Sequence, residues 1–310
     1  MVSKIQRPHR NKQGAESFFD NNNFIMTQAE ADSLVQDALA KWHPATKDES
    51  EQINNQLLEE FPDRYAPDDF WDAPTEQYLD FFVWGHNHDF GHGVTRDGAM
   101  TTRHLEITSR AIRLGYLPAD LSGKRVLNIG CWTGGDSLVL AGLGAYVVSL
   151  EEHKIAAAAG ARLMELLGAP GEFQSRSIFD DDEGLRQSFD YVYCSGVIYH
   201  VTDPMLLLRI CFCYLKPGGG CFIETKSTAE SGDDALCSYS GILERGWNWY
   251  GPNQKALGRW FVDSGYDMET VKVHRRGNDR LLAYGAKGSA LRLPENAGFS
   301  RPGSWLEGEH

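Results

Sequence analysis

Short apolar and β-branched runs alternate with helical stretches from Arg125 onward, and this alternation constrains the fold more than any other feature. Strands that alternate with helices predict a doubly wound, mostly parallel α/β sheet. The last two runs flank 276–279 and are spaced as an antiparallel C-terminal hairpin. The predicted strands are 126–130, 146–151, 189–196, 220–225, 268–274 and 281–287, and the predicted helices are 136–142, 155–167, 205–215 and 254–264.

The part of the chain before Arg125 has a helical pattern instead. Thr27 and Glu30 form a T-x-x-E capping box before apolar residues at helical spacing, and Pro44 ends that helix. A second short helix is predicted near 52–61, and a helix near 101–114 joins this part to the sheet. The predicted units are a polar, disordered arm (1–22), a helical cap and substrate lid (23–99), an α/β ligand-binding domain (100–290) and a C-terminal tail (291–310).

The first predicted strand runs into a glycine-rich turn and then a helix, which is the context of a nucleotide-binding loop. A dinucleotide site needs glycine at 130, 132 and 135, but Trp132 occupies the second position, so NAD and FAD are disfavoured. S-adenosylmethionine has no phosphate to cradle, and Glu151 ends the next strand, where an acid accepts hydrogen bonds from ribose hydroxyls. The pattern favours S-adenosylmethionine as cofactor in a Rossmann-like fold. A structural turn with a surface acid is the alternative.

Several segments resemble one enzyme family. NIGCWTGG (128–135), the run 189–208, LKPGGGCFIET (215–225) and WNWYGPN (247–253) are similar to motifs of class I S-adenosylmethionine-dependent methyltransferases. Within that class they most resemble the branch related to tRNA wobble-uridine 5-oxyacetate methyltransferases (DUF1698-like), over about residues 82–287. The resemblance implies a methyltransferase with S-adenosylmethionine as its cofactor.

The resemblance also indicates where the cofactor binds. Asn128 replaces the usual first acid of the loop, which orients the loop amides and contacts the methionine amine, so the charge attraction is lost. Ser177 aligns with the usual acid after the third strand, and Ile178 and Phe179 would wall the adenine. The predicted cofactor-binding residues are Asn128, Gly130, Cys131, Trp132, Gly134, Glu151, Glu152, Ser177, Ile178, Phe179, Ser195 and Gly196.

Tyr199 and His200 follow the fourth strand and would lie over the methyl group in this fold. They are predicted to orient the acceptor or to shuttle its proton, although His200 could equally be structural. Related enzymes that use carboxy-S-adenosylmethionine have a tyrosine at the position of Tyr199. The ordinary cofactor is expected here.

The loop 84–98 is a second candidate for the acceptor side, because it is similar to a segment that precedes the core in this branch. His86, His88 and His92 with Asp89 suggest a zinc or iron site, since imidazole and carboxylate suit those metals. Because the loop is rich in glycine and methyl transfer needs no Lewis acid, no metal is expected. His88 and Asp89 are predicted to be catalytic residues of a lid, with simple packing as the alternative.

Further side chains are candidates for binding the substrate. Arg96 and Arg103 could hold a carboxylate through two parallel hydrogen bonds. The aromatic residues near 247–250 would either wall the pocket or pack under the hairpin. The predicted substrate-binding residues are Trp84, His86, Arg96, Arg103, Trp249, Tyr250 and Asn253.

Charge and composition restrict the function further. A net charge of −13 opposes the approach of polyanions, so a small-molecule acceptor (amino-acid-like or a specialised metabolite) is favoured over nucleic acid. No apolar run is long enough for a membrane span, no secretory signal is evident, and six dispersed cysteines suit a cytoplasmic protein. A tRNA-modifying enzyme and a non-catalytic S-adenosylmethionine-binding protein are the alternatives. A homodimer is left open.

Overall fold

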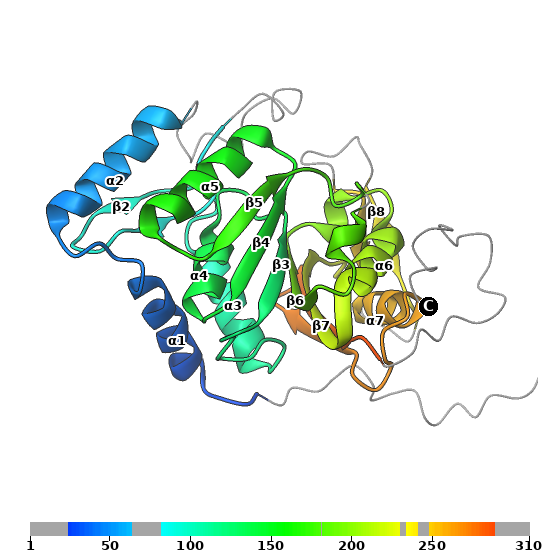
Figure 1. The fold of residues 1–310 in the computed structure, drawn as a ribbon. Coiled ribbons are helices and arrows are strands. Elements are labelled where there is room, and N and C mark those ends of the chain that lie inside the picture. The colour runs from blue at the N-terminus through cyan, green and yellow to red at the C-terminus, as the bar shows by residue number, and fades with distance from the viewer. Residues whose placement is uncertain (1–23, 64–81, 181, 230–233, 241–247, 289–310) are drawn as a thin grey trace, which may run out of the picture.

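The computed structural model describes residues 24–63, 82–180, 182–229, 234–240 and 248–288. Its centre is a seven-stranded sheet with the order β10-β11-β7-β6-β3-β4-β5 (Figure 1). The strands from β7 to β5 are parallel, whereas β11 pairs antiparallel with both β7 and β10. The strands are β3 (Arg125–Ile129), β4 (Tyr146–Glu151), β5 (Gly171–Ser175), β6 (Phe189–Ser195), β7 (Leu215–Lys226), β10 (Lys272–Arg276) and β11 (Arg280–Ala286). The predicted doubly wound fold with an antiparallel hairpin is confirmed.

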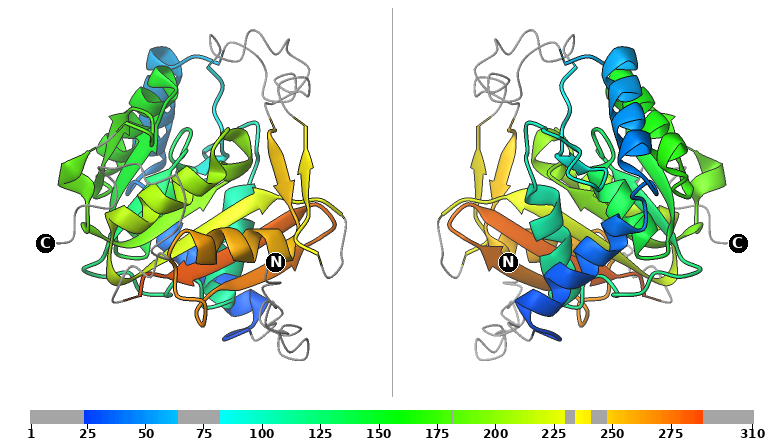
Figure 2. Two further views of the ribbon diagram at one scale, coloured as in Figure 1. Left: turned by 90° about the vertical axis from the view of Figure 1, so that its right-hand side faces the viewer. Right: turned by 90° about the vertical axis from the view of Figure 1, so that its left-hand side faces the viewer.

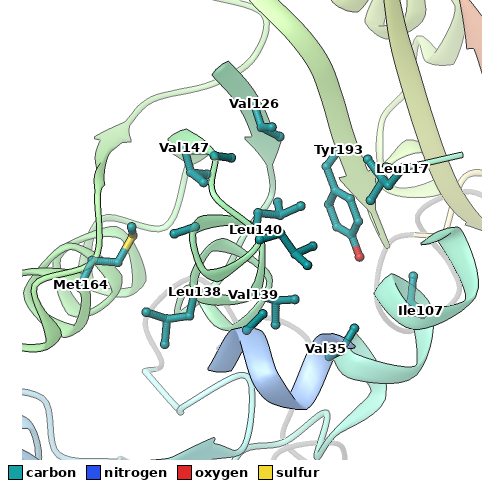
Figure 3. Close-up of a cluster of buried hydrophobic side chains, with 14 of the residues drawn as sticks. Val35, Ile107, Leu117, Val126, Leu138, Val139, Leu140, Val147, Met164 and Tyr193 are labelled. Carbon is teal, nitrogen blue, oxygen red and sulfur yellow. The ribbon is translucent and has the colours of Figure 1, made fainter. Parts of the chain in front are cut away.

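Helices cover both faces of this sheet. Successive residues of a strand point to opposite faces, so Val126 and Tyr193 join one apolar cluster while Leu127 and Val192 join the other. Helices α1, α3, α4 and α5 pack on the first face, where Figure 3 shows their side chains around Leu140. Helices α6 and α7 pack on the second face. The helices are α1 (Gln28–Ala40), α2 (Lys47–Glu60), α3 (Arg103–Arg113), α4 (Gly135–Gly142), α5 (Lys154–Leu167), α6 (Pro204–Tyr214) and α7 (Gln254–Asp263).

The N-terminal helices lie directly on the helices of the sheet. A Cβ at Gly142 of α4 would lie 2.2 Å from the carbonyl oxygen of Ala38, so α1 and α4 approach as closely as their backbones allow. After α1, Lys41 donates to the carbonyl of Gly142 at 2.5 Å, and the indole of Trp42 donates to the carbonyl of Leu138 at 2.9 Å. The predicted cap therefore shares its apolar core with the α/β layer.

The ends of the N-terminal helices follow local capping chemistry. The Thr27–Glu30 capping box is confirmed at the start of α1. The start of α2 was predicted near residue 52, but the helix begins at Lys47, because Thr46 and Glu49 form a second capping box. The predicted arm (1–22) and tail (291–310) lie outside the described residues.

Two short β-pairs stand at one end of the sheet. The first consists of β1 (His88–Asp89) and β2 (Thr95–Arg96), and the second of β8 (Cys237–Tyr239) and β9 (Tyr250–Pro252). Figure 2 shows the β8–β9 pair rising above the same end of the sheet as the segment around β1 and β2. Among the described residues, no helix is both long and apolar enough to cross a membrane.

Candidate active-site cleft

A cleft of about 1040 Å³ lies beyond the carboxyl ends of the parallel strands. This is where open α/β sheets bind their ligands. Its walls come from the ends of β3 to β7, from the start of α3, and from the turn before β11. The following predicted residues line it: His86, Arg103, Gly130, Trp132, Glu151, Glu152, Ile178, Ser195, Gly196, Tyr199 and His200.

The turn after β3 is held tightly against its surroundings. Gly130 has φ +64°, and a Cβ there would lie 2.3 Å from a methyl group of Val197. Trp132 has φ +47°, and its ring lies so close to Gly85 that a Cβ at Gly85 would be 2.4 Å from it. The glycines therefore permit close approach of the backbone, and the bulky Trp132 is a packing residue as well as part of the cleft wall.

Glu151 connects this turn to the end of β4. Its carboxylate accepts hydrogen bonds from the backbone N–H groups of Trp132 at 2.8 Å and of His153 at 2.9 Å. Burial raises the pKa of Glu151, although the two backbone bonds oppose that shift. Glu151 thus lies at the strand end and lines the cleft, and its binding of ribose hydroxyls stays a prediction.

Five predicted cofactor residues do not line the cleft, and their positions have local causes. Asn128 is buried on the α4 side of β3 and donates to the hydroxyl of Ser137 at 3.0 Å. Cys131 is buried beside the carbonyl of Leu150, with Sγ 3.8 Å from that oxygen. Gly134 caps α4, and Phe179 packs against the second apolar cluster. The Ser177 hydroxyl donates to the carboxylate of Glu152, so it supports the cleft wall from behind.

An ion pair and a tyrosine form the end of the cleft at β7 and β11. The guanidinium of Arg280 donates to both carboxylate oxygens of Glu224, at 2.6 and 3.1 Å, and Glu224 is 0% exposed. The same guanidinium lies 5.1 Å from the ring centroid of Tyr199 and 3.5 Å from its hydroxyl. Burial raises the pKa of Tyr199, so it remains a neutral hydroxyl. The sequence identified Tyr199 but not its two partners, because their contact depends on the β7–β11 pairing.

Two imidazoles lie at the opposite wall. The rings of His86 and His104 are 4.6 Å apart, and Nδ1 of His86 accepts from the backbone N–H of Gly135 at 3.2 Å. Burial lowers the pKa of His86 to about 4 and that of His104 well below its usual value, so both are neutral. The Nδ1 atom of His104 has no hydrogen-bond partner in the described part of the chain. Sequence reasoning missed His104, Asp136 and Arg176, which also line the cleft.

The predicted catalytic pair of the lid does not reach the cleft. His88 is 4% exposed, and its ring packs 5.4 Å from Trp84 and 6.4 Å from Phe90. Asp89 accepts the backbone N–H of Gly91 at 2.8 Å and so closes a surface turn. The prediction that both side chains face the acceptor is wrong, because the strand pair β1–β2 packs against the core. Within the described ranges, no group of three or more His, Cys, Asp and Glu side chains could hold a metal.

Five of the predicted substrate-binding residues do not line the cleft and serve the fold instead, namely Trp84, Arg96, Trp249, Tyr250 and Asn253. Arg96 lies 4.9 Å from the Trp84 ring and donates to the backbone and side chain of Asn54 at 2.6 and 2.8 Å. Asn253 caps α7 by accepting from the N–H of Ala256 at 2.9 Å. Trp249 and Tyr250 pack against Tyr239 of β8 and do not line the cleft.

Comparison with known proteins places these features in a family. A family model described as a methyltransferase domain matches residues 102–271, which is more than half of the chain. The ubiquinone biosynthesis O-methyltransferase of Xanthomonas oryzae pv. oryzae is 36% identical over 120 residues, which are 37% of this chain and 48% of that protein. The protein of the same name from Xanthomonas campestris pv. campestris is 36% identical over 121 residues, which are 37% of this chain and 48% of that protein. The chain thus spans about half the length of the curated relatives it matches.

A solved structure shares the fold. The N-terminal domain of EvdMO1, crystallised in the presence of SAH (S-adenosylhomocysteine) and D-fucose, is 19% identical with a TM-score of 0.54, covering 76% of this chain and 96% of that one. The matched family region contains the turn after β3, Glu151 and Tyr199. The resemblance to class I methyltransferases is confirmed, while the narrower branch stays a prediction. The chain therefore belongs to the family of S-adenosylmethionine-dependent methyltransferases that share this domain.

Proposed function

We propose that the chain transfers the methyl group of S-adenosylmethionine to a small, polar acceptor that binds beside Tyr199. The observation that carries this proposal is the buried Glu224–Arg280 ion pair, which ends the cleft and touches the Tyr199 hydroxyl. Polar groups that line a cleft lose hydrogen bonds to water when a ligand covers them, so this wall favours a ligand that offers hydrogen bonds over an apolar chain.

The rest of the cleft supports the same class of acceptor. Arg103, Lys226 and Asp279 add charged groups of both signs to the lining. The volume of about 1040 Å³ lies just above the range for ligand pockets, about 300–1,000 Å³. A cleft of this volume can hold a cofactor and one small molecule together. An amino-acid-like molecule or a specialised metabolite with several polar groups fits these properties.

The reaction requires positioning more than acid–base chemistry. Displacement at a sulfonium is in line, so the acceptor atom must be held about 3–3.5 Å from the methyl group. Glu151 would hold the ribose, and Ile178 lines the adjacent wall after β5, where adenine would bind. Tyr199 would orient the acceptor, and the exposed His200 would take a proton from an oxygen or nitrogen acceptor. A thioether acceptor would need no base.

The proposal is tested by following the label from methyl-labelled S-adenosylmethionine. Wild-type protein is incubated with three acceptor pools, namely the polar metabolites of a cell extract, its lipids, and bulk tRNA. We expect label in the polar pool, and we expect the Glu151→Ala variant, as the matched control, to transfer far less. Label in the lipid pool would contradict the polar acceptor. Label in tRNA that falls steeply with added salt would favour a nucleic-acid substrate instead.

A further inference from the structure

Asp136 is a buried carboxyl group that faces the cleft with one oxygen free. It lies in the first turn of α4 and is 6% exposed. Its Oδ1 accepts hydrogen bonds from the hydroxyl of Tyr193 at 3.0 Å and, more weakly, from that of Thr108 at 3.4 Å. Figure 3 shows the Tyr193 ring reaching from β6 toward the helix that carries Ile107. Its Oδ2 accepts no hydrogen bond from any described residue, so that oxygen is available to a ligand.

The groups around Asp136 do not neutralise it. His86 contacts the start of α4 and His104 lies on α3, and both imidazoles are neutral. Tyr193 faces Asp136 from β6, and Glu224 faces it from β7. No Lys or Arg in the described segments forms an ion pair with Asp136. Burial raises the pKa of Asp136 to about 7, against the hydrogen bonds from Tyr193 and Thr108. A buried carboxylate without a cation is costly, so a cationic ligand group is the natural partner.

The order of the strands indicates which ligand group this is. Glu151 and Ile178 form the adenosine end of the cleft at β4 and β5, while Tyr199 and Arg280 form the acceptor end at β6, β7 and β11. A sulfonium carries three substituents, and the third is the amino-acid chain. Asp136 lies between these two ends, on the wall made by α3 and α4.

We propose that Asp136 binds the α-ammonium group of the methionine portion of S-adenosylmethionine. This rests on the cofactor named above. The acid that the family has at position 128 is absent, and Asn128 is turned to Ser137, away from the cleft. Asp136 supplies a negative charge from the next element instead.

A second polar atom on the same wall supports the assignment. His104 precedes Thr108 by one helical turn, so both lie on the same face of α3. Its Nδ1 atom is buried and has no partner among the described residues, and the residue lines the cleft. An amino-acid group with an ammonium and a carboxylate can satisfy both this nitrogen and the free oxygen of Asp136.

The test compares two ligands that differ in one amino group. Binding of SAH and of its deaminated analogue, in which hydrogen replaces the α-amino group, is measured by calorimetry for wild type and Asp136→Asn. We expect Asp136→Asn to weaken SAH binding about 10-fold or more, because a charge-assisted bond is lost, and to change binding of the analogue by less than about twofold. Glu151→Gln, the matched control, should weaken both ligands alike. Equal effects of Asp136→Asn on both ligands, or no effect on SAH, would overturn the proposal.

The wild type provides a second test that does not depend on any variant folding. Binding of the ammonium favours ionised Asp136, so SAH affinity should rise between about pH 6 and pH 8, with proton release, because the pKa of Asp136 is about 7. The deaminated analogue should show no such rise and should bind about 10-fold or more weakly at pH 8. The same pH profile for both ligands would refute Asp136 as the ammonium site. Failure of the wild type to bind either ligand would instead overturn the cofactor assignment, and this proposal with it.

Discussion

Replacing Glu224 with glutamine should destabilise the protein strongly, because it leaves the Arg280 guanidinium without a counter-charge. The Glu224 and Arg280 side chains are 0% and 11% exposed, and two hydrogen bonds join them. Removing one partner of a buried ion pair costs about 3–5 kcal/mol, and the oxygen that glutamine keeps places the loss near about 3 kcal/mol. An unfolding entropy of about 2.1 cal/mol/K per residue gives about 0.65 kcal/mol/K for 310 residues, so each kcal/mol lowers the midpoint of thermal unfolding by about 1.5 °C. Calorimetry should therefore show a decrease of about 4 °C or more.

The pair between Arg276 and Glu106 is the matched control. It also has two hydrogen bonds, at 3.0 and 2.5 Å, but the Glu106 side chain is 49% exposed. A surface pair contributes about 0–1 kcal/mol, so Glu106→Gln should lower the midpoint by no more than about 1.5 °C. Equal shifts in the two variants would refute the reasoning that burial makes the Glu224 pair essential.

Three further predictions concern the turn, the surface and the cleft. Gly130→Ala should weaken SAH binding about 10-fold or more in calorimetry, because the positive φ and the 2.3 Å approach to Val197 exclude a Cβ. The control variant Gly168→Ala should bind SAH normally, since Gly168 also has a positive φ (+67°) but has open space around it. Asp89→Ala should keep near-normal kcat/KM in the methyl-transfer assay, since its carboxylate serves a surface turn, and a large loss would restore the lid hypothesis. Urea unfolding should show that Asp136→Asn and the wild type are equally stable near pH 4, and that the variant is more stable by up to about 4 kcal/mol above pH 7. The pKa of Asp136 is raised from 3.8 to about 7 in the folded state, so the wild type loses stability as pH rises through the folded pKa, whereas the variant does not. A constant difference across this pH range would contradict the raised pKa.

The features that the sequence predicted correctly are those set by local chemistry. The strand 146–151 was predicted at its observed bounds, since a short run that contains Val147, Val148 and Leu150 suits a buried strand. The Thr27–Glu30 capping box likewise depends on short-range spacing.

The missed features depend on contacts between distant segments. Arg280 contacts Glu224 because β11 pairs with β7, and the register of that pairing cannot be predicted from either segment alone. His88 looked catalytic because it is ionisable and lies near glycines, yet its ring is buried against Trp84. Asn128 looked exposed to the cofactor because the family acid is there, but the pleat of β3 directs it toward Ser137.

A titration of SAH into wild type and Glu151→Ala tests the central claim most directly, that the cleft beyond β3 and β4 is the cofactor site. The account predicts one site per chain in the wild type. It also predicts affinity at least about 10-fold weaker in the variant, since hydrogen bonds to a charged acceptor contribute about 1.5–3 kcal/mol each. Absence of binding to the wild type, or equal affinity of the two proteins, would contradict it.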